Sequence, residues 1–283
     1  MRFELEVAPI DLDLTLGCGQ TFRWEHSPDG TWSGVLGNQS VCLRLKGSRI
    51  EGNATPGGRG VRDSVLEHLR ADDDIDKIQR RLRRDTILAT GMKRMRGLRI
   101  VKIDEWECLV SYVLATYANI PRITKMVNAL ATKYGSRIVN GRYAFPTIEQ
   151  LSKASAKDLA RLGLGYRAGY IEEICNQIDE RTISTLSRES HEDLRRKLIE
   201  LPGVGSKVAD CVCLFGFGKL ESFPIDLWIE RALARLYHQK GSYQRLRAFA
   251  SDRFGEYAGY AQEYLYHNER MRARDLGCVF SKE

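Results

Sequence analysis

Long apolar runs are absent from this chain of 283 residues, and its first residues, MRFELEVAPI, lack the apolar core of a secretory signal. No segment approaches the roughly 18 consecutive apolar residues that a membrane-spanning helix needs. These absences argue against a membrane protein, and we expect an intracellular one.

Cysteine is scarce, and its spacing is irregular. The number of cysteines is odd, and they lack the paired spacing of a metal-binding motif: Cys18, Cys42, Cys108, Cys175, Cys211, Cys213 and Cys278. We therefore expect reduced thiols and predict no metal site. The nearest pair, Cys211 and Cys213, would be small core residues on a helix.

Negative charge is in deficit. Lysine and arginine number 44 against 37 acidic residues, which gives a formal net charge of +7. Such an excess suits a polyanionic partner such as nucleic acid. A basic protein without that partner would have the same composition, so charge alone leaves both readings open.

The N-terminal part has the pattern of a small sheet. Apolar and polar residues alternate from Phe3 to about Ile50, and Gly37-Asn38 separates two short runs as a hairpin turn does. A glycine-rich turn follows at 57–60. Residues 61–85 are highly charged with apolar residues every three or four positions, which predicts a helical stretch.

From Asp104 onward the pattern is helical, with N-cap candidates at Asp104, Ser155 and Ser190. We therefore predict an α+β fold. A small antiparallel β-sheet domain with a helical connection, residues 1–103, precedes a mainly α-helical domain, residues 104–283.

The stretch LPGVGSKVADC, residues 201–211, interrupts two predicted helices. Gly203 and Gly205 allow close backbone approach, and the free N–H groups of the second helix favour a phosphate. An ordinary turn between two helices would have the same glycines. Lys207 stands at the start of the second helix, where a lone lysine would otherwise be a solvated surface charge.

Five blocks together carry a family resemblance: GQTFRW, NIPRIT, LGLGYRAGY, LPGVGSKVADC and YAGYAQ. In this order they resemble the eukaryote-like 8-oxoguanine DNA glycosylases of the helix-hairpin-helix DNA glycosylase superfamily. The resemblance implies base excision repair by a bifunctional glycosylase and lyase. Such an enzyme flips 8-oxoguanine, opposite cytosine, out of duplex DNA, cleaves its glycosidic bond through a lysine Schiff base and nicks the strand by β-elimination.

The same resemblance implies the enzyme's setting. Its partner would be double-stranded DNA containing 8-oxoguanine, with no membrane, and the protein would act as a monomer in the cytoplasm, associated with the nucleoid, or in a nucleus. No cofactor is required, and a cation bound by the hairpin carbonyls stays open.

Two residues match the family's catalytic positions. Lys207 would attack the anomeric carbon, because a neutral, positioned amine can displace the base and then form a Schiff base. Asp226, in SFPIDLWIER, would stabilise the positive charge that develops on the sugar. Asp226 is also a good N-cap for the following helix, and both roles can hold together.

Four residues match the family's base-binding positions. The carbonyl of Gly19 would read the proton that oxidation adds to the guanine ring. Gln262 would bond the pairing edge of the base, while Cys211 and Tyr266 would sandwich it, with Tyr266 replacing the usual phenylalanine. Without the resemblance, Gly19 would be a turn residue and the other three ordinary core.

The remaining matches concern DNA outside the base pocket. Tyr166 matches the wedge residue that fills the gap left in the base stack when the lesion is flipped out. Arg122 and Arg167 match the two arginines that bind the unpaired cytosine. Further DNA contacts are predicted at Tyr117, Asn119, Gly203, Gly205 and Trp228. Tyr117 and Ala118 stand where the family has asparagines, and Trp228 replaces a histidine, with Arg231 a candidate substitute for its phosphate contact.

Two other readings compete with this one. An endonuclease III-like enzyme would share Lys207 and Asp226, but a four-cysteine iron–sulfur loop near the C-terminus is excluded because only Cys278 follows Cys213. A non-catalytic DNA-binding module would also explain the charge and the hairpin. Borohydride trapping on damaged DNA distinguishes the two, because only the enzyme would form the trapped adduct.

Overall fold

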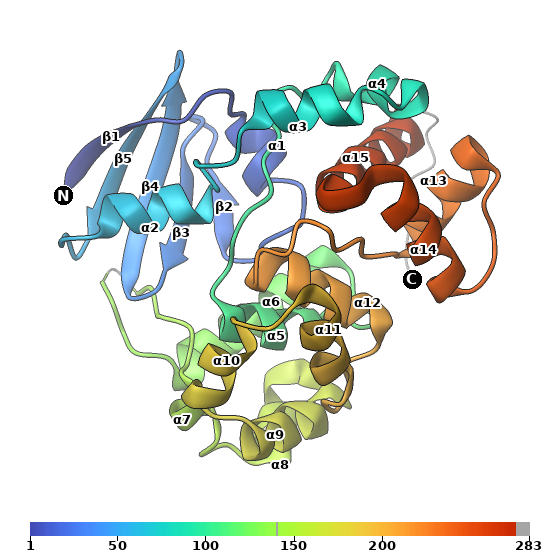
Figure 1. Ribbon diagram of the computed structural model, residues 1–283. Coiled ribbons are helices and arrows are strands. Elements are labelled where there is room, and N and C mark those ends of the chain that lie inside the picture. The colour runs from blue at the N-terminus through green and yellow to red at the C-terminus, as the bar shows by residue number, and fades with distance from the viewer. Residues whose placement is uncertain (140, 276–283) are drawn as a thin grey trace.

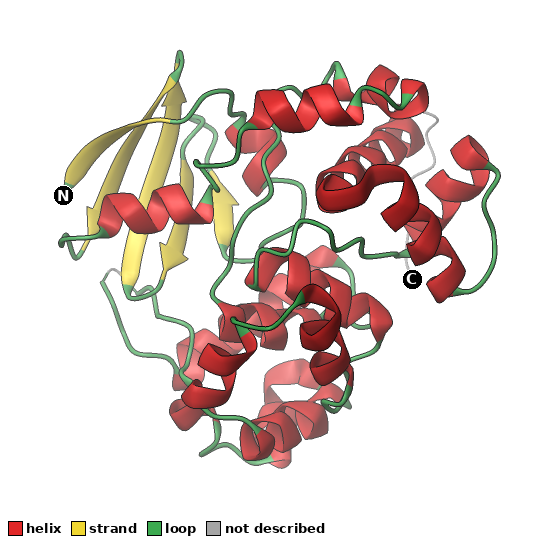
Figure 2. Ribbon diagram, in the orientation of Figure 1, coloured by secondary structure: helices red, strands yellow, loops and turns green. Residues whose placement is uncertain are grey.

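The computed structural model describes residues 1–139 and 141–275. A sheet built from the N-terminal part of the chain is followed by an almost wholly helical remainder, as Figures 1 and 2 show. The predicted α+β fold is confirmed. Within the described ranges, no helix combines the length and the apolar character that crossing a bilayer requires.

The sheet has five antiparallel strands in the order β1-β5-β4-β3-β2. The strands are β1 (Arg2–Glu6), β2 (Trp24–His26), β3 (Trp32–Leu36), β4 (Gln39–Lys46) and β5 (Arg49–Thr55). In β1 and β5, buried residues alternate strictly with exposed ones, as expected for a sheet with one packed face. The predicted hairpin is confirmed, since Leu36 pairs with Gln39 across Gly37-Asn38 and Gly37 has φ +56°.

The charged stretch at 61–85 forms two helices rather than one continuous helix. Helix α2 (Val61–His68) lies across the sheet, and α3 (Ile75–Leu82) lies apart from it, towards the helical part of the molecule (Figure 1). Arg70 takes a left-handed φ of +47° just after α2. Asp74 then caps α3, its side chain accepting the Lys77 amide at 2.8 Å. Aspartates favour such caps over helix interiors, which is why the apolar period alone did not reveal the break.

The helical remainder follows the predicted start sites. Asp104, Ser155 and Ser190 are N-caps whose side chains accept the amide three residues on. The helices not yet bounded are α1 (Leu12–Leu16), α4 (Thr86–Met92), α5 (Glu105–Leu114), α6 (Ile120–Tyr134), α7 (Ile148–Leu151), α8 (Ala156–Leu159), α9 (Arg167–Gln177), α10 (Glu180–Leu186), α11 (His191–Ile199), α12 (Ser206–Cys211), α13 (Leu227–Tyr237), α14 (Tyr243–Phe254) and α15 (Ala258–Asp275).

Helix α15, where the described part of the chain ends, packs against α4 and beside α3, both from the N-terminal third of the chain (Figure 1). Buried tyrosines make the connection: Tyr260 donates its hydroxyl proton to Asp73 at 2.6 Å, and Gln79 donates to the Tyr264 hydroxyl at 3.1 Å. Residues far apart in sequence are thereby fixed against each other. Arg270 of α15 also donates to the carbonyl of Cys18 in the loop after α1, at 2.6 Å.

A buried histidine joins the sheet to the helices. His68, at the end of α2, is 4% exposed. Its Nδ1 lies 2.7 Å from the Lys102 carbonyl, and its Nε2 accepts the Trp24 indole N–H at 3.0 Å. A carbonyl can only accept and an indole N–H can only donate, so the neutral Nδ1–H tautomer is fixed. Burial lowers the pKa of His68 to about 4.

We expect this histidine to make stability fall in mild acid. Because the folded pKa lies below the ordinary value, His68 contributes stability that is present above about pH 6.5 and lost as pH falls toward 4, on the order of 3 kcal/mol. Urea unfolding across this range measures it. His68→Gln should flatten the pH slope, whereas His26→Gln, at an exposed ring, should keep it. Parallel slopes for parent and His68→Gln would refute the assignment.

Candidate active site

A cavity of about 600 Å³ lies between the start of the chain, the α5–α6 loop, α12, α13 and α15. It gathers eight of the residues singled out from the sequence. These are Gly19, Asn119, Lys207, Cys211, Asp226, Trp228, Gln262 and Tyr266.

Lys207 is the second residue of α12, directly after the hairpin turn. Its amine lies 5.2 Å from the ring centre of Tyr112, a buried aromatic of α5. The N-cap, Gly205, supplies no capping side chain. A β-carbon added at Gly205 would meet nothing within 4 Å, whereas one at Gly203, where φ is +73°, would strike the Tyr170 ring. The helix start is therefore open to an approaching backbone.

A buried carboxylate fixes α12 in place. Asp210 is fully buried and accepts the Arg195 guanidinium of α11 at 2.8 Å and the Tyr243 hydroxyl of α14 at 2.6 Å. The same Tyr243 hydroxyl accepts the backbone N–H of Ile225 at 3.2 Å. Because Ile225 precedes Asp226, this bridge sets the position of Asp226 relative to Lys207.

Asp226 is the N-cap of α13, accepting the Ile229 amide at 2.9 Å, so the predicted capping role is confirmed. Burial raises the pKa of its carboxyl above the ordinary value, and the Ile229 amide and the Lys207 ammonium act against that rise. The amine and the carboxylate therefore interact within one cavity.

Three hydrogen bonds of Gln20 hold the Gly19 loop, the segment 17–23 between α1 and β2. The Gln20 side chain donates to the Arg99 carbonyl at 3.0 Å and accepts the Val101 amide at 2.9 Å. Tyr112 donates its hydroxyl proton to the Gln20 carbonyl at 3.0 Å. The backbone beside Gly19 is thus fixed before any ligand enters the cavity.

Gly19 itself has φ +98°, and an added β-carbon would lie 2.6 Å from Ile120 Cδ1. An alanine here would be strained with or without a base in the cavity. Replacing Gly19 therefore cannot separate base recognition from local structure.

Three candidate base contacts line the same cavity. Cys211 is buried, which raises its thiol pKa to about 12 although the Lys207 charge opposes the rise. Gln262 is 5% exposed, and its Oε1 has no hydrogen-bond partner among the described residues. Tyr266 is partly buried one helical turn further along α15. A buried acceptor left free in this way suits a ligand that donates.

A second hollow of about 630 Å³ lies beside the hairpin. Tyr117 and Tyr166 line it together with Gly203 and Gly205. Tyr117 is 94% exposed with a left-handed φ of +48°, and Tyr166 is 54% exposed. Two exposed aromatics over an open helix start are the features of a surface that receives a polyanion with stackable bases.

The two candidate arginines differ in environment. Arg122 is exposed in the first turn of α6, and Asn119 caps that helix by accepting the Arg122 amide at 3.0 Å. Arg167 is 2% exposed, and its guanidinium donates to the carbonyls of Thr116 and Tyr117. In this structure Arg167 fixes the α5–α6 loop, a contact that the sequence did not reveal.

Trp228 lines the cavity beside Asp226, and the guanidinium of Arg231 lies 5.7 Å from its ring centre. The two residues therefore form one cationic and aromatic surface at the start of α13.

Sequence reasoning missed two charged residues of the cavity, Glu263 and Arg270 on α15. Arg270 donates to the Cys18 carbonyl at 2.6 Å. Burial, with the charge of Asp226, raises the pKa of Glu263 to about 8. Their spacing from Tyr266, three positions before it and four positions after it, was the one available indication, since residues three or four apart share a helix face.

Three features of this structure together define a class of base excision enzymes. They are a hairpin that presents a lysine, an aspartate that lines the same cavity, and an N-terminal part that contains a sheet. Residues 110–254 match the HhH-GPD superfamily of base excision DNA repair proteins, and residues 2–109 match the N-terminal domain of 8-oxoguanine DNA glycosylase. The chain belongs to the 8-oxoguanine DNA glycosylase family and is a bifunctional DNA N-glycosylase and lyase.

Named relatives support this assignment. The chain is 27% identical to the N-glycosylase/DNA lyase OGG1 of Arabidopsis thaliana, over 96% of this chain and 81% of that protein. It is 26% identical to the N-glycosylase/DNA lyase of Saccharomyces cerevisiae, over 95% and 85%. The solved 8-oxoguanine glycosylase/lyase of Clostridium acetobutylicum, in complex with duplex DNA containing cytosine opposite 8-oxoguanine, has a TM-score of 0.88 and 26% identity, covering 96% of this chain and 98% of that chain.

Proposed function

We propose that this glycosylase excises 8-oxoguanine from duplex DNA, with cytosine as the partner base, through a Schiff base on Lys207. The observation that carries the proposal is the single cavity in which Lys207 and Asp226 meet Gly19, Cys211, Gln262 and Tyr266. Support comes from the C. acetobutylicum enzyme, whose complex holds that base pair.

The reaction follows from the two charged groups. The neutral amine of Lys207 attacks the anomeric carbon, and the glycosidic bond breaks as the base leaves with its electron pair and takes up a proton. Asp226 faces the positive charge that develops on the sugar. Opening of the ring gives the imine, β-elimination then breaks the bond to the 3′ phosphate, and water frees Lys207. No cofactor is needed for these steps.

Recognition of the oxidised base would use the residues that line the cavity around Lys207 and Asp226. The flipped base, which costs a few kcal/mol to unstack, would lie between Cys211 and Tyr266. The fixed carbonyl of Gly19 accepts the ring proton that normal guanine lacks, and the free Oε1 of Gln262 accepts from the pairing edge.

Contacts with the strand left behind fall to the second hollow. Tyr166 and Tyr117 are exposed aromatics that can enter the vacated stack, and Asn119 fixes the start of α6 between the two hollows. Arg122 is exposed beside them, so we assign the grip on the orphaned cytosine first to Arg122. Arg167 would join it only after leaving the carbonyls of Thr116 and Tyr117.

Duplexes with one 8-oxoguanine opposite each of the four bases test the proposal. We expect fastest release opposite cytosine. Arg122→Ala should lose about 1–3 kcal/mol of that discrimination, the worth of one charged base contact. Lys125→Ala, which removes a neighbouring exposed cation of α6, is the control and should keep the ratios. Equal rates for all four partners in the parent protein would contradict the cytosine preference.

A further inference from the structure

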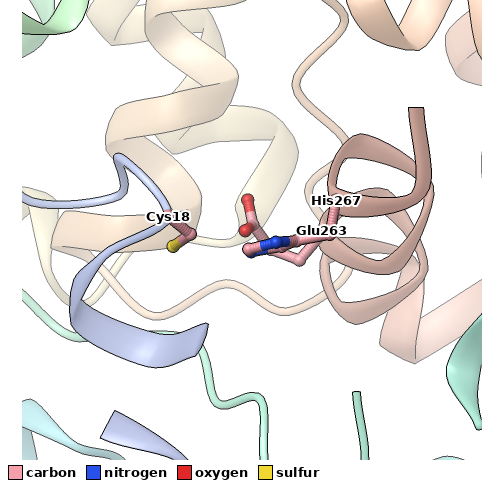
Figure 3. Close-up of side chains that lie close together, drawn as sticks. All are labelled: Cys18, Glu263 and His267. Carbon is pink, nitrogen blue, oxygen red and sulfur yellow. The ribbon is translucent and has the colours of Figure 1, made fainter. Parts of the chain in front are cut away.

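Behind one wall of the cavity, three potential metal ligands converge (Figure 3). Cys18 comes from the loop after α1, and Glu263 and His267 come from α15. Their sulfur, oxygen and nitrogen atoms lie within 4.8 Å of one another, and all three residues are buried. We propose that these residues bind a zinc ion that joins the Gly19 loop to α15.

The geometry favours a metal over a chance cluster. Glu263 and His267 are four positions apart, so both point from one face of α15. Cys18 faces them from the loop after α1. In tetrahedral zinc sites with such ligands, the donor atoms lie roughly 3.4–3.7 Å apart. The present separations, none above 4.8 Å, lie within about 1.5 Å of this range.

An incomplete hydrogen-bond set marks the same place. Glu263 is 3% exposed, yet its Oε2 has no hydrogen-bond partner in the part of the chain that the structure describes. Leaving a buried carboxyl oxygen without a donor is costly, and a cation would satisfy it. The Cys18 thiol donates to the Thr15 carbonyl at 3.4 Å, a weak contact that a metal–sulfur bond would replace.

Charge balance also permits a divalent ion. Binding would release the protons of the Cys18 thiol and, where present, of the Glu263 carboxyl, so thiolate and carboxylate would neutralise the metal charge. Arg270 is already bonded to the Cys18 carbonyl and would face a neutral site. Sulfur, imidazole and carboxylate together suit zinc, with water as the fourth ligand.

Such an ion would not touch the reacting atoms. Of the three ligands Glu263 alone is among the residues that line the cavity, so the metal would lie on the side of Glu263 that faces Cys18 and His267. It would hold the Gly19 carbonyl at a set distance from Gln262 and Tyr266 on α15. Binding of the metal itself does not depend on the lesion that the enzyme removes.

Cobalt(II), which replaces zinc and absorbs light, gives a test without any DNA. Added to the full chain after treatment with a chelator, it should give a thiolate-to-cobalt charge-transfer band and the intense visible bands of a four-coordinate ion, and zinc should displace it. Cys18→Ser should lose the charge-transfer band. His267→Gln should weaken binding by more than the roughly 10–100-fold that losing an outer-shell partner costs.

Cys42→Ser is the matched control, because Cys42 lies on β4 away from the cluster, and it should keep both bands. Circular dichroism verifies that each variant is folded, and His267→Gln remains a complete test if Cys18→Ser is unstable. No four-coordinate spectrum in the parent protein, or an unchanged spectrum in His267→Gln, would overturn the proposal.

Discussion

Lys207→Gln is expected to lose base release by at least about a thousandfold, and with it the adduct that borohydride traps, while lesion-containing DNA still binds. The amine is the only group that the substitution removes from the start of α12. The turn glycines, the open helix start and the Asp210 anchor stay as they are. Single-turnover release, trapping and a binding titration on one duplex measure the three quantities.

Lys153→Gln is the control, since it removes an exposed lysine paired with Glu149 on α7, away from the cavity. It should release and trap at the parental rate. If Lys207→Gln still formed the trapped adduct at that rate, another amine would be the nucleophile and the proposed Schiff base would be misassigned.

Asp226→Asn should slow base release by about 10²–10³, the usual loss when an electrostatic stabiliser of a transition state is removed. Asparagine can still accept the Ile229 amide, so α13 keeps its cap. Burial raises the pKa of this carboxyl, which means that the charged form is disfavoured in the fold. The free energy of unfolding of Asp226→Asn should therefore be at least that of the parent.

Asp226→Ala separates the two roles of the residue. It loses the cap as well as the charge, so it should unfold about 1 kcal/mol more easily while releasing base as slowly as Asp226→Asn. Trapping on DNA with a preformed abasic site should survive in both variants, because Lys207 is intact. Rapid base release by Asp226→Asn would show that the carboxylate acts only as a cap.

Much of this site could be predicted because short motifs fix local structure. LPGVGSKVADC encodes the hairpin through its glycines, and the order of five blocks carries the family. Gly19, Asn119, Lys207, Cys211 and Gln262 from these blocks line one cavity in the folded chain, and Tyr166, Gly203 and Gly205 line the second hollow. The helix starts at Asp104, Ser155 and Ser190 could be predicted as well, because a side-chain cap depends only on residues within three positions of each other.

What stayed hidden depends on packing between distant segments. The sequence contains no hint that Cys18 meets Glu263 and His267, since contacts between distant segments, such as those of Tyr260 with Asp73 and of Arg270 with the Cys18 carbonyl, place α15 beside the loop after α1. Arg167 was predicted to grip the orphaned cytosine, and the sequence did not reveal that its guanidinium also donates to loop carbonyls. No sequence pattern states which of two arginines becomes buried.

The bridge from Asp210 through Tyr243 to Ile225 joins α12, which carries Lys207, to the chain just before Asp226, and α15, which carries Gln262 and Tyr266, lies outside this bridge. The amine comes from α12 and the carboxylate from the N-cap of α13, whereas three of the four proposed base contacts, Gly19, Gln262 and Tyr266, come from the Gly19 loop and α15, with Cys211 of α12 the fourth. Exchanging side chains on α15 would change its contacts with the base and leave the amine and carboxylate in register. The architecture therefore allows substitutions on α15 to change which damaged base is bound, while the two groups proposed to break the glycosidic bond stay the same.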